Sequence, residues 1–326
     1  MRIHIQNPPD DPLFAFDHAQ WDAAVARNPD IGQGHDVSIA QDAEGFAVAA
    51  PDMEVLIAWT SQARKLFPCD APKLKIISFT SAGVDRLAPF EWMPPGVSVL
   101  NNSGVHGDKA GEYALMAVLM LGNLMPRFAT KQREQVWDGS RASVLKGRDV
   151  VVVGTGTLGG ATAEQLGRLG MRVTGVSFSG RQHPACARTL PVSGIDAVLP
   201  ETEFLVLTAP LTEASRNLLS RERIAMLPKQ AGVVNIGRGP LIDQEALCDA
   251  LDAERIAGAV LDVFAEEPVP PGHRLWTTRN LIMTPHMSSD DPGTYNPRTL
   301  DIFFANLRAL RDGKPMPNRV DPQRGY

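Results

Sequence analysis

The sequence predicts an α/β protein built on a doubly wound parallel sheet, with a second, smaller α/β unit in its first hundred residues. Apolar Val/Ile/Leu runs alternate with helical patterns through the middle of the chain, and a glycine-rich turn joins one run to a helix. Strands without polar alternation are typical of parallel sheets, because helices cover both faces. Two domains are expected for 326 residues, since a single core seldom grows beyond about 250.

The N-terminal part contains short apolar runs separated by polar, proline and glycine segments. These runs predict strands over residues 55–59, 75–79 and 97–100, and the alternation of polar and apolar residues over 2–6 predicts a first strand. A helix is predicted from about Asp108, with apolar residues at 3.6-residue spacing, and Pro126 is expected to end or kink it. Because this helix is apolar nearly all round, we expect it to be buried between domains.

The middle of the chain alternates strand and helix in a regular order. Strands are predicted over residues 150–153, 172–176, 204–208, 233–236, 258–261 and 281–284. Helical patterns occupy 161–169 and 243–251, and a final amphipathic helix is predicted from about 293 to 311, before Gly313. The order is that of strands joined by helical crossovers.

Composition and charge exclude several classes of function. A net charge of −5 argues against a nucleic-acid partner or an anionic membrane surface. Cys69, Cys186 and Cys248 lack CxxC spacing, so neither a disulfide framework nor a metal site is expected. The longest apolar run lies between Glu112 and Gly122, short of the roughly 20 residues that span a bilayer. Residues 2–6 alternate like a strand where a secretory signal would be apolar, so we expect a cytoplasmic protein.

The sharpest local pattern is Gly154-Thr155-Gly156-Thr157-Leu158-Gly159, directly after a predicted strand and at the start of a helix. In that context the pattern predicts the Rossmann dinucleotide-binding turn rather than an ordinary glycine-rich turn. Gly154 permits the tight turn, Gly156 lets a pyrophosphate approach the backbone, and Gly159 allows close packing of helix on strand. The helix N-terminus offers free N–H groups to the phosphates.

The end of the next strand indicates which dinucleotide binds. NAD enzymes place an acidic residue there for the ribose 2′-hydroxyl, but no acidic residue lies between Glu164 and Asp196. The segment instead carries Ser177, Ser179 and Arg181. Hydroxyls and a guanidinium suit a 2′-phosphate. The sequence therefore favours NADP, with NAD as a weaker cofactor, although Arg181 could also be a solvated loop residue.

Three polar residues follow successive strands at the edge where a doubly wound sheet binds ligands: Arg238, Glu267 and His286. A guanidinium can hold a carboxylate and polarise a neighbouring carbonyl, an imidazolium can protonate the carbonyl oxygen, and a carboxylate can orient that imidazole. Singly, each residue has an ordinary explanation as a surface side chain. Together they predict reduction of a 2-oxo acid.

The chain resembles the D-isomer-specific 2-hydroxyacid dehydrogenase family over nearly its whole length, and more narrowly its glyoxylate/hydroxypyruvate reductases. Besides the glycine turn, the matching segments are Ser81-Ala82-Gly83-Val84-Asp85, Gly111-Glu112-Tyr113-Ala114-Leu115, Ala209-Pro210-Leu211-Thr212, Asn235 to Gly239, Leu261 to Pro268, Pro285-His286 and Asn318-Arg319-Val320-Asp321. Several motifs in a fixed order are far more specific than any one of them.

The resemblance implies a role for each matching residue. Arg238 would bind and polarise the substrate, and His286, paired with Glu267, would be the general acid/base. The backbone N–H groups of Ala82 and Gly83 would meet the substrate carboxylate. The implied cofactor contacts are Thr157, Leu158, Ala209, Pro210 and Ile236, together with Asp262 at the nicotinamide carboxamide.

The resemblance also implies an interrupted domain order and a homodimer. A flavodoxin-like substrate domain would comprise residues 1–103 and 288–326, with the cofactor domain, 104–287, inserted between them. Trp59 and Trp137 lie either near the cleft or in domain-interface packing. The sequence departs from the family at two places. It lacks the acidic residue that NAD members use to bind the ribose, and it has Met287-Ser288-Ser289-Asp290-Asp291 after the His, where relatives commonly have small residues.

Two other functions compete with a hydroxyacid dehydrogenase. Formate dehydrogenases share the scaffold but pair the catalytic His with Gln, so Glu267 argues against one. A non-enzymatic nucleotide-sensing scaffold or corepressor is the other, and the intact Arg238, Glu267 and His286 argue against it. The resemblance leaves the identity of the 2-oxo acid and the direction of the reaction open.

Overall fold

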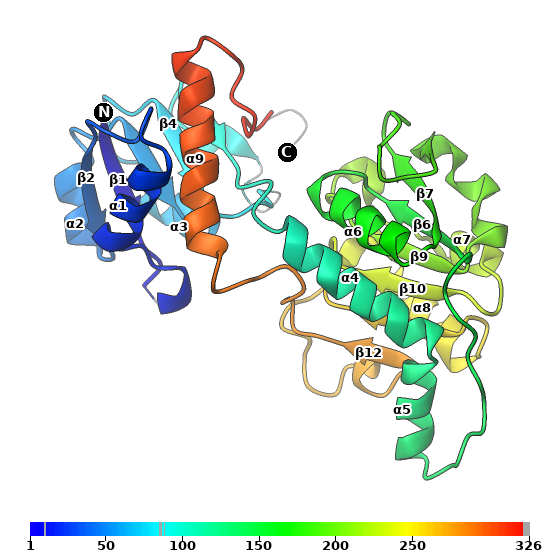
Figure 1. The fold of residues 1–326 in the computed structure, drawn as a ribbon. Helices are drawn as coiled ribbons and strands as arrows, with labels where there is room; N and C mark the ends of the chain where they lie inside the picture. The colour runs from blue at the N-terminus through cyan, green and yellow to red at the C-terminus, as the bar shows by residue number, and fades with distance from the viewer. Residues whose placement is uncertain (10, 85–86, 88, 322–326) are drawn as a thin grey trace. The chain divides into compact units, whose positions relative to one another are not determined.

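The computed structural model describes residues 1–9, 11–84, 87 and 89–321. The chain divides into two compact units (Figure 1). The smaller unit comprises Met1–His106 together with the segment from Asp291 onward, and the larger comprises Gly107–Asp290. The chain therefore passes from one unit to the other at two places, residues 106–107 and 290–291.

The smaller unit holds a five-stranded parallel sheet in the order β2-β1-β3-β4-β5. Its strands are β1 (Arg2–Gln6), β2 (Asp36–Ala40), β3 (Val55–Ala58), β4 (Ile76–Phe79) and β5 (Ser98–Leu100). Its helices are α1 (His18–Arg27), α2 (Ala43–Ala49), α3 (Thr60–Leu66) and α9 (Tyr295–Arg311). The C-terminal helix α9 belongs to this unit because its Phe303 and Phe304 pack against Trp21 of α1.

The larger unit holds a seven-stranded parallel sheet in the order β12-β11-β10-β9-β6-β7-β8. Its strands are β6 (Asp149–Val153), β7 (Arg172–Ser177), β8 (Arg188–Pro191), β9 (Phe204–Leu207), β10 (Gly232–Asn235), β11 (Gly258–Leu261) and β12 (Leu281–Met283). The strand order reverses at β6, which pairs with both β7 and β9. In open sheets of this kind ligands bind at that reversal, outside the carboxyl ends of the strands.

Helices cover both faces of the larger sheet. The helices of this unit are α4 (Gly107–Gly122), α5 (Met125–Arg133), α6 (Thr157–Arg168), α7 (Arg221–Met226) and α8 (Gln244–Asp252). Val150 and Val152 pack in one core cluster with α4 and α6, whereas Val151 and Val153 pack in another with α7 and α8. Because helices cover both faces, the inner strands β9, β10 and β11 are buried along their whole length, and the predicted doubly wound fold is confirmed.

The structure corrects the expectation for Pro126. Helix α4 ends at Gly122, where an added Cβ would lie 2.4 Å from Leu145 Cδ2. Leu124 then adopts a left-handed backbone with φ 59°, and Pro126 lies in the first turn of α5. A proline costs nothing there because its missing N–H has no helical partner. Strands β2 and β8 were not predicted; both are sheet-edge strands of mostly polar or half-exposed residues.

Within the described part of the chain, no helix combines the length and the hydropathy that a bilayer crossing requires.

Candidate active site

The loops after β6, β7, β9, β10, β11 and β12 all leave the same edge of the larger sheet, because its strands are parallel. The predicted cofactor-binding and catalytic residues of this unit lie at the ends of these strands, in these loops or in the first turn of the helix that follows. Ala82 and Gly83 lie in the smaller unit, and within the described residues their N–H groups donate no hydrogen bond. Asp85 of the same segment lies outside the described residues.

The conformation of the glycine turn after β6 requires residues without a Cβ. Gly154 has φ 95°, and a Cβ there would lie 2.6 Å from the Ala209 nitrogen. A Cβ on Gly159 would lie 1.7 Å from the Gly154 carbonyl oxygen, so helix α6 begins in direct contact with the turn. A Cβ on Gly156, by contrast, would meet nothing within 4 Å. This open space, beside a helix start without a side-chain cap, fits the pyrophosphate of a dinucleotide.

The end of β7 carries the hydroxyls and the guanidinium that were singled out in the sequence. The Ser177 hydroxyl accepts the Gly180 N–H at 3.1 Å, and the Ser179 hydroxyl accepts the Arg181 N–H at 3.3 Å. Because each hydroxyl here acts as an acceptor, its own proton is left to donate to a ligand. Arg181 is exposed and forms no ion pair with any carboxylate of the described residues. The loop can therefore receive an anion.

His183 is a neighbour of this loop that sequence reasoning missed. Its Nδ1 accepts the Ala185 N–H at 3.2 Å, which places the ring proton on Nε2 when the imidazole is neutral. The ring lies against α6, where a Cβ on Gly160 would be 2.9 Å from Nε2. The signal in the sequence was the fourth glycine, Gly160, directly after the motif.

Arg238 follows β10 on a short, firmly held turn. Asn235 is 1% exposed; its amide donates to the Arg238 carbonyl at 2.9 Å, and its side-chain oxygen accepts the Gly237 N–H at 3.1 Å. Gly239 packs on the backbone of Phe264, since a Cβ there would lie 1.9 Å from the Phe264 carbonyl carbon. The turn that carries Arg238 therefore contacts the loop that carries Glu267. Asn235 is a second supporting residue; the sequence placed it in a matching segment but gave it no role.

His286 and Glu267 form a hydrogen-bonded pair across two loops. Nδ1 of His286 lies 2.9 Å from Oε2 of Glu267, and the other Glu267 oxygen accepts the Phe264 N–H at 2.9 Å. The Glu267 side chain is 20% exposed and that of His286 42% exposed. Because Nδ1 is directed at the carboxylate, the ring presents Nε2 as its free nitrogen. The arrangement is that of an oriented acid/base imidazole.

Asp262 lies at the end of β11 with no exposed surface. Its two carboxylate oxygens accept the backbone N–H groups of Met287 and Ser288, each at 2.9 Å. The implied contact of Asp262 with a nicotinamide carboxamide stays a prediction.

The two tryptophans singled out in the sequence have different surroundings. Trp59 stacks on Phe14 in the smaller unit, with ring centroids 4.9 Å apart. Trp137, after α5 in the larger unit, is 98% exposed.

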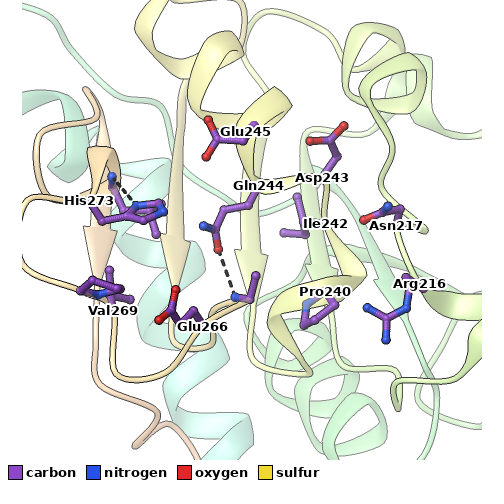
Figure 2. Close-up of a pocket in the computed structure, with 13 residues that line it drawn as sticks. Arg216, Asn217, Pro240, Ile242, Asp243, Gln244, Glu245, Glu266, Val269 and His273 are labelled. Carbon is purple, nitrogen blue, oxygen red and sulfur yellow. Dashed lines mark hydrogen bonds between the residues drawn. The ribbon is translucent and has the colours of Figure 1, made fainter.

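A hollow of about 520 Å³ lies on the larger unit beside the loops that carry Arg238 and Glu267, and none of Arg238, Glu267 and His286 lines it. Figure 2 shows Pro240 and Glu266 at its wall, with the Gln244 side chain hydrogen-bonded to the Ala265 N–H at 3.2 Å. Among the described residues, no group of three or more His, Cys, Asp or Glu side chains could hold a metal ion.

Fold and site together define a dinucleotide-binding α/β protein, and comparison with known proteins specifies the family. Residues 115–288 match the family model described as "D-isomer specific 2-hydroxyacid dehydrogenase, NAD binding domain". A glyoxylate reductase of Thermofilum pendens is 30% identical over 260 residues, covering 78% of this chain and 76% of that protein. A glyoxylate/hydroxypyruvate reductase B of Erwinia tasmaniensis is 30% identical over 261 residues, covering 78% and 80%.

Among solved structures, a D-isomer specific 2-hydroxyacid dehydrogenase of Xanthobacter autotrophicus, in complex with NADPH and MES, superimposes with a TM-score of 0.81. The two chains are 30% identical, with coverage of 100% and 99%. The chain belongs to the D-isomer-specific 2-hydroxyacid dehydrogenase family. It is accordingly an oxidoreductase of the hydride-transferring kind, with a nicotinamide dinucleotide as cofactor.

Proposed function

We propose that this protein reduces a small 2-oxo acid to the corresponding D-2-hydroxy acid with NADPH, glyoxylate and hydroxypyruvate being the first substrates to test. The observation that carries the proposal is the His286–Glu267 pair, 2.9 Å apart at the carboxyl edge of the sheet with Nε2 directed away from the carboxylate. The names of the relatives from Thermofilum pendens and Erwinia tasmaniensis support the substrate class.

Each catalytic residue has a defined role in this proposal. Bound NADPH supplies the hydride that reaches the carbonyl carbon. Arg238 holds the substrate carboxylate and polarises its carbonyl, for which a planar guanidinium with several donors is suited. Protonated His286 donates the proton from Nε2 to the carbonyl oxygen, and Glu267 stabilises the imidazolium before transfer. In the reverse direction neutral His286 takes the hydroxyl proton.

The division of labour between the units follows the family resemblance. The larger unit binds the dinucleotide, with the pyrophosphate over Gly156 and the N-terminus of α6. The smaller unit contributes the N–H groups of Ala82 and Gly83 to the substrate carboxylate. We propose contacts of Thr157, Leu158, Ala209, Pro210 and Ile236 with the dinucleotide on the same basis.

NADP is proposed over NAD because of the charge at the end of β7. Ser177, Ser179 and Arg181 offer two hydroxyls and a cation where an NAD enzyme has a carboxylate. His183 adds an imidazole beside the start of α6. NADPH bound to the relative from Xanthobacter autotrophicus is consistent with this preference.

A spectrophotometric assay tests the proposal directly. Glyoxylate, hydroxypyruvate, pyruvate and phenylpyruvate would each be offered with NADPH and, separately, with NADH. We expect turnover with at least one of the smaller acids and a higher kcat/KM for NADPH. Tight dinucleotide binding without turnover of any acid would instead favour the nucleotide-sensing scaffold.

A further inference from the structure

A chain of partly buried hydrogen bonds runs from helix α4 to the loop that carries His286. The Thr284 hydroxyl donates to Asp262 Oδ1 at 2.5 Å, and Tyr113 Oη lies 2.5 Å from the same Thr284 oxygen. Thr284 has a single hydroxyl proton, and Asp262 receives it. The phenol of Tyr113 must therefore donate to Thr284.

The surroundings of Tyr113 keep its proton in place. The residue is 4% exposed, and burial together with the nearby Asp262 charge raises the pKa of its phenol to about 12, although the Thr284 bond acts in the opposite direction. Tyr113 therefore remains a donor throughout the pH range in which a dehydrogenase is assayed. The direction Tyr113 to Thr284 to Asp262 is fixed.

The far end of the network holds a strained backbone. His286 has φ 53°, in the left-handed region that a residue with a Cβ seldom occupies. Its N–H donates to the Asp262 carbonyl at 2.8 Å, and the next two N–H groups, of Met287 and Ser288, donate to the Asp262 carboxylate. Asp262 thus holds the main chain at His286 and at the two residues after it. Such a conformation persists only where the surroundings over-determine it.

Resting on the function proposed above, we propose that Tyr113 and Thr284, acting through Asp262, are positioning residues for the proton donor His286. The three side chains fix the loop in the backbone conformation that brings Nδ1 of His286 to Glu267. Tyr113 and Thr284 need not touch substrate or cofactor for this role, and Asp262 can fill it alongside its predicted contact with the nicotinamide carboxamide. The sequence alone does not reveal the network, because its members lie on α4, β11 and the end of β12.

Loss of the Thr284 hydroxyl would break the network at its centre. Thr284→Val removes one donor from the buried Asp262 carboxylate and leaves the Tyr113 phenol without an acceptor, at nearly constant volume. Because the Asp262 carboxylate has then lost a hydrogen-bond donor, it can rearrange, and the His286 loop can relax. Because misplacement by about 1 Å can cost 100-fold in rate, we expect kcat to fall roughly 10- to 100-fold. KM for NADPH should change much less than kcat, because the glycine turn that is proposed to bind the pyrophosphate is elsewhere.

The matched control is Thr202→Val. Thr202 is 1% exposed in the same unit, and its hydroxyl donates to the Val198 carbonyl at 2.8 Å, away from the catalytic loops. This variant also loses one threonine hydroxyl bond, so its thermal unfolding temperature should fall by a similar amount while kcat is retained. Thr284→Ser keeps the hydroxyl and should restore most of the turnover, and Tyr113→Phe should show a milder form of the Thr284→Val defect.

A spectroscopic measurement tests the positioning without a substrate. In ¹⁵N-histidine-labelled enzyme, with the His286 signals assigned by their loss in His286→Gln, the neutral ring should show a fixed Nδ1–H tautomer because Glu267 accepts that proton. We expect the two nitrogen shifts to move toward an average in Thr284→Val and to remain distinct in Thr202→Val and Thr284→Ser.

Wild-type kcat and an unchanged tautomer in both Thr284→Val and Tyr113→Phe would overturn the proposal. An equal loss in Thr202→Val would also overturn it, because general loosening would then be the cause. If the wild type reduced no 2-oxo acid while the tautomer still depended on Thr284, the proposed function would fail and the positioning network would stand.

Discussion

Two loops at the same edge of the larger sheet are held in opposite ways. The turn after β6 depends on glycines: there is no room for a Cβ at Gly154 or Gly159, and there is open space beside Gly156. The segment after β12 is built by polar side chains, with His286 held at φ 53° by bonds to Asp262. A phosphate needs room and backbone N–H groups, whereas a proton donor needs a fixed direction. The comparison predicts that changes in the first loop affect dinucleotide binding and changes in the second affect turnover.

The largest effect is expected at His286. His286→Ala removes the proton donor, so turnover should fall roughly 10²- to 10⁴-fold in both directions. NADPH affinity, measured by fluorescence titration, should change little because the phosphate contacts lie on the other loop. His18→Ala, an exposed histidine of the smaller unit, is the control and should leave both values unchanged. An active His286→Ala enzyme would mean that another group donates the proton.

A smaller loss is expected at Arg238. Lysine keeps the charge but cannot present two planar donors to a carboxylate and a carbonyl together. Arg238→Lys should therefore raise KM for the oxo acid and lower kcat, with a combined loss of about 100-fold in kcat/KM if one charge-assisted bond and its geometry are lost. Arg216→Lys, on the wall of the hollow, should be neutral. Loss of NADPH affinity with intact oxo-acid kinetics would assign Arg238 to the cofactor instead.

Two glycine substitutions separate space for packing from space for a ligand. Gly159→Ala puts a Cβ into the Gly154 carbonyl oxygen, so overpacking should lower the free energy of unfolding by about 1–3 kcal/mol. The Cβ that Gly156→Ala adds would meet no protein atom within 4 Å. The thermal unfolding temperature should therefore be unchanged while NADPH affinity falls. Unaltered NADPH affinity in Gly156→Ala would show that the pyrophosphate does not lie over this residue.

The smallest effect concerns discrimination between cofactors. Arg181→Ala should weaken NADPH by about 1–3 kcal/mol, the range for one lost bond to a charged group. Kinetics with NADH should be unchanged in the same variant, which serves as its own control. Competition by 2′,5′-ADP should weaken in parallel, whereas competition by 5′-AMP should not. An equal loss with both cofactors would contradict a 2′-phosphate contact.

Local sequence order accounts for much of this fold and for one of the two loops. The apolar runs predict the inner strands because both faces of the sheet are buried, and Gly154 to Gly159 define their turn within six consecutive residues. The edge strands β2 and β8 were missed because half-exposed strands lack a continuous apolar run.

The residues that support the His286 loop could not be predicted from the sequence, for a different reason. Tyr113, Asp262 and Thr284 are distant in the chain, and a tyrosine on an apolar helix gives no sign of a polar partner. The left-handed backbone at His286 is likewise a result of tertiary bonds, since nothing in Pro285-His286-Met287 demands it. Asn235 was given no role and His183 was missed because their bonds, to Arg238 and to Ala185, are short side-chain-to-backbone bonds within one turn, which leave no distinct pattern in the sequence.

The central claim is that His286, oriented by Glu267, carries the proton, and pH–rate profiles of the wild type and Glu267→Gln test it most directly. Reduction requires protonated His286, so kcat/KM for the oxo acid should fall at alkaline pH, where His286 of the free enzyme has lost its proton. The Glu267 carboxylate favours the imidazolium, and glutamine removes that charge while it can keep a hydrogen bond. The alkaline limb of reduction should therefore move to lower pH in Glu267→Gln, while oxidation of the hydroxy acid becomes relatively less impaired at moderate pH. An alkaline limb that stays at the wild-type position would contradict the account.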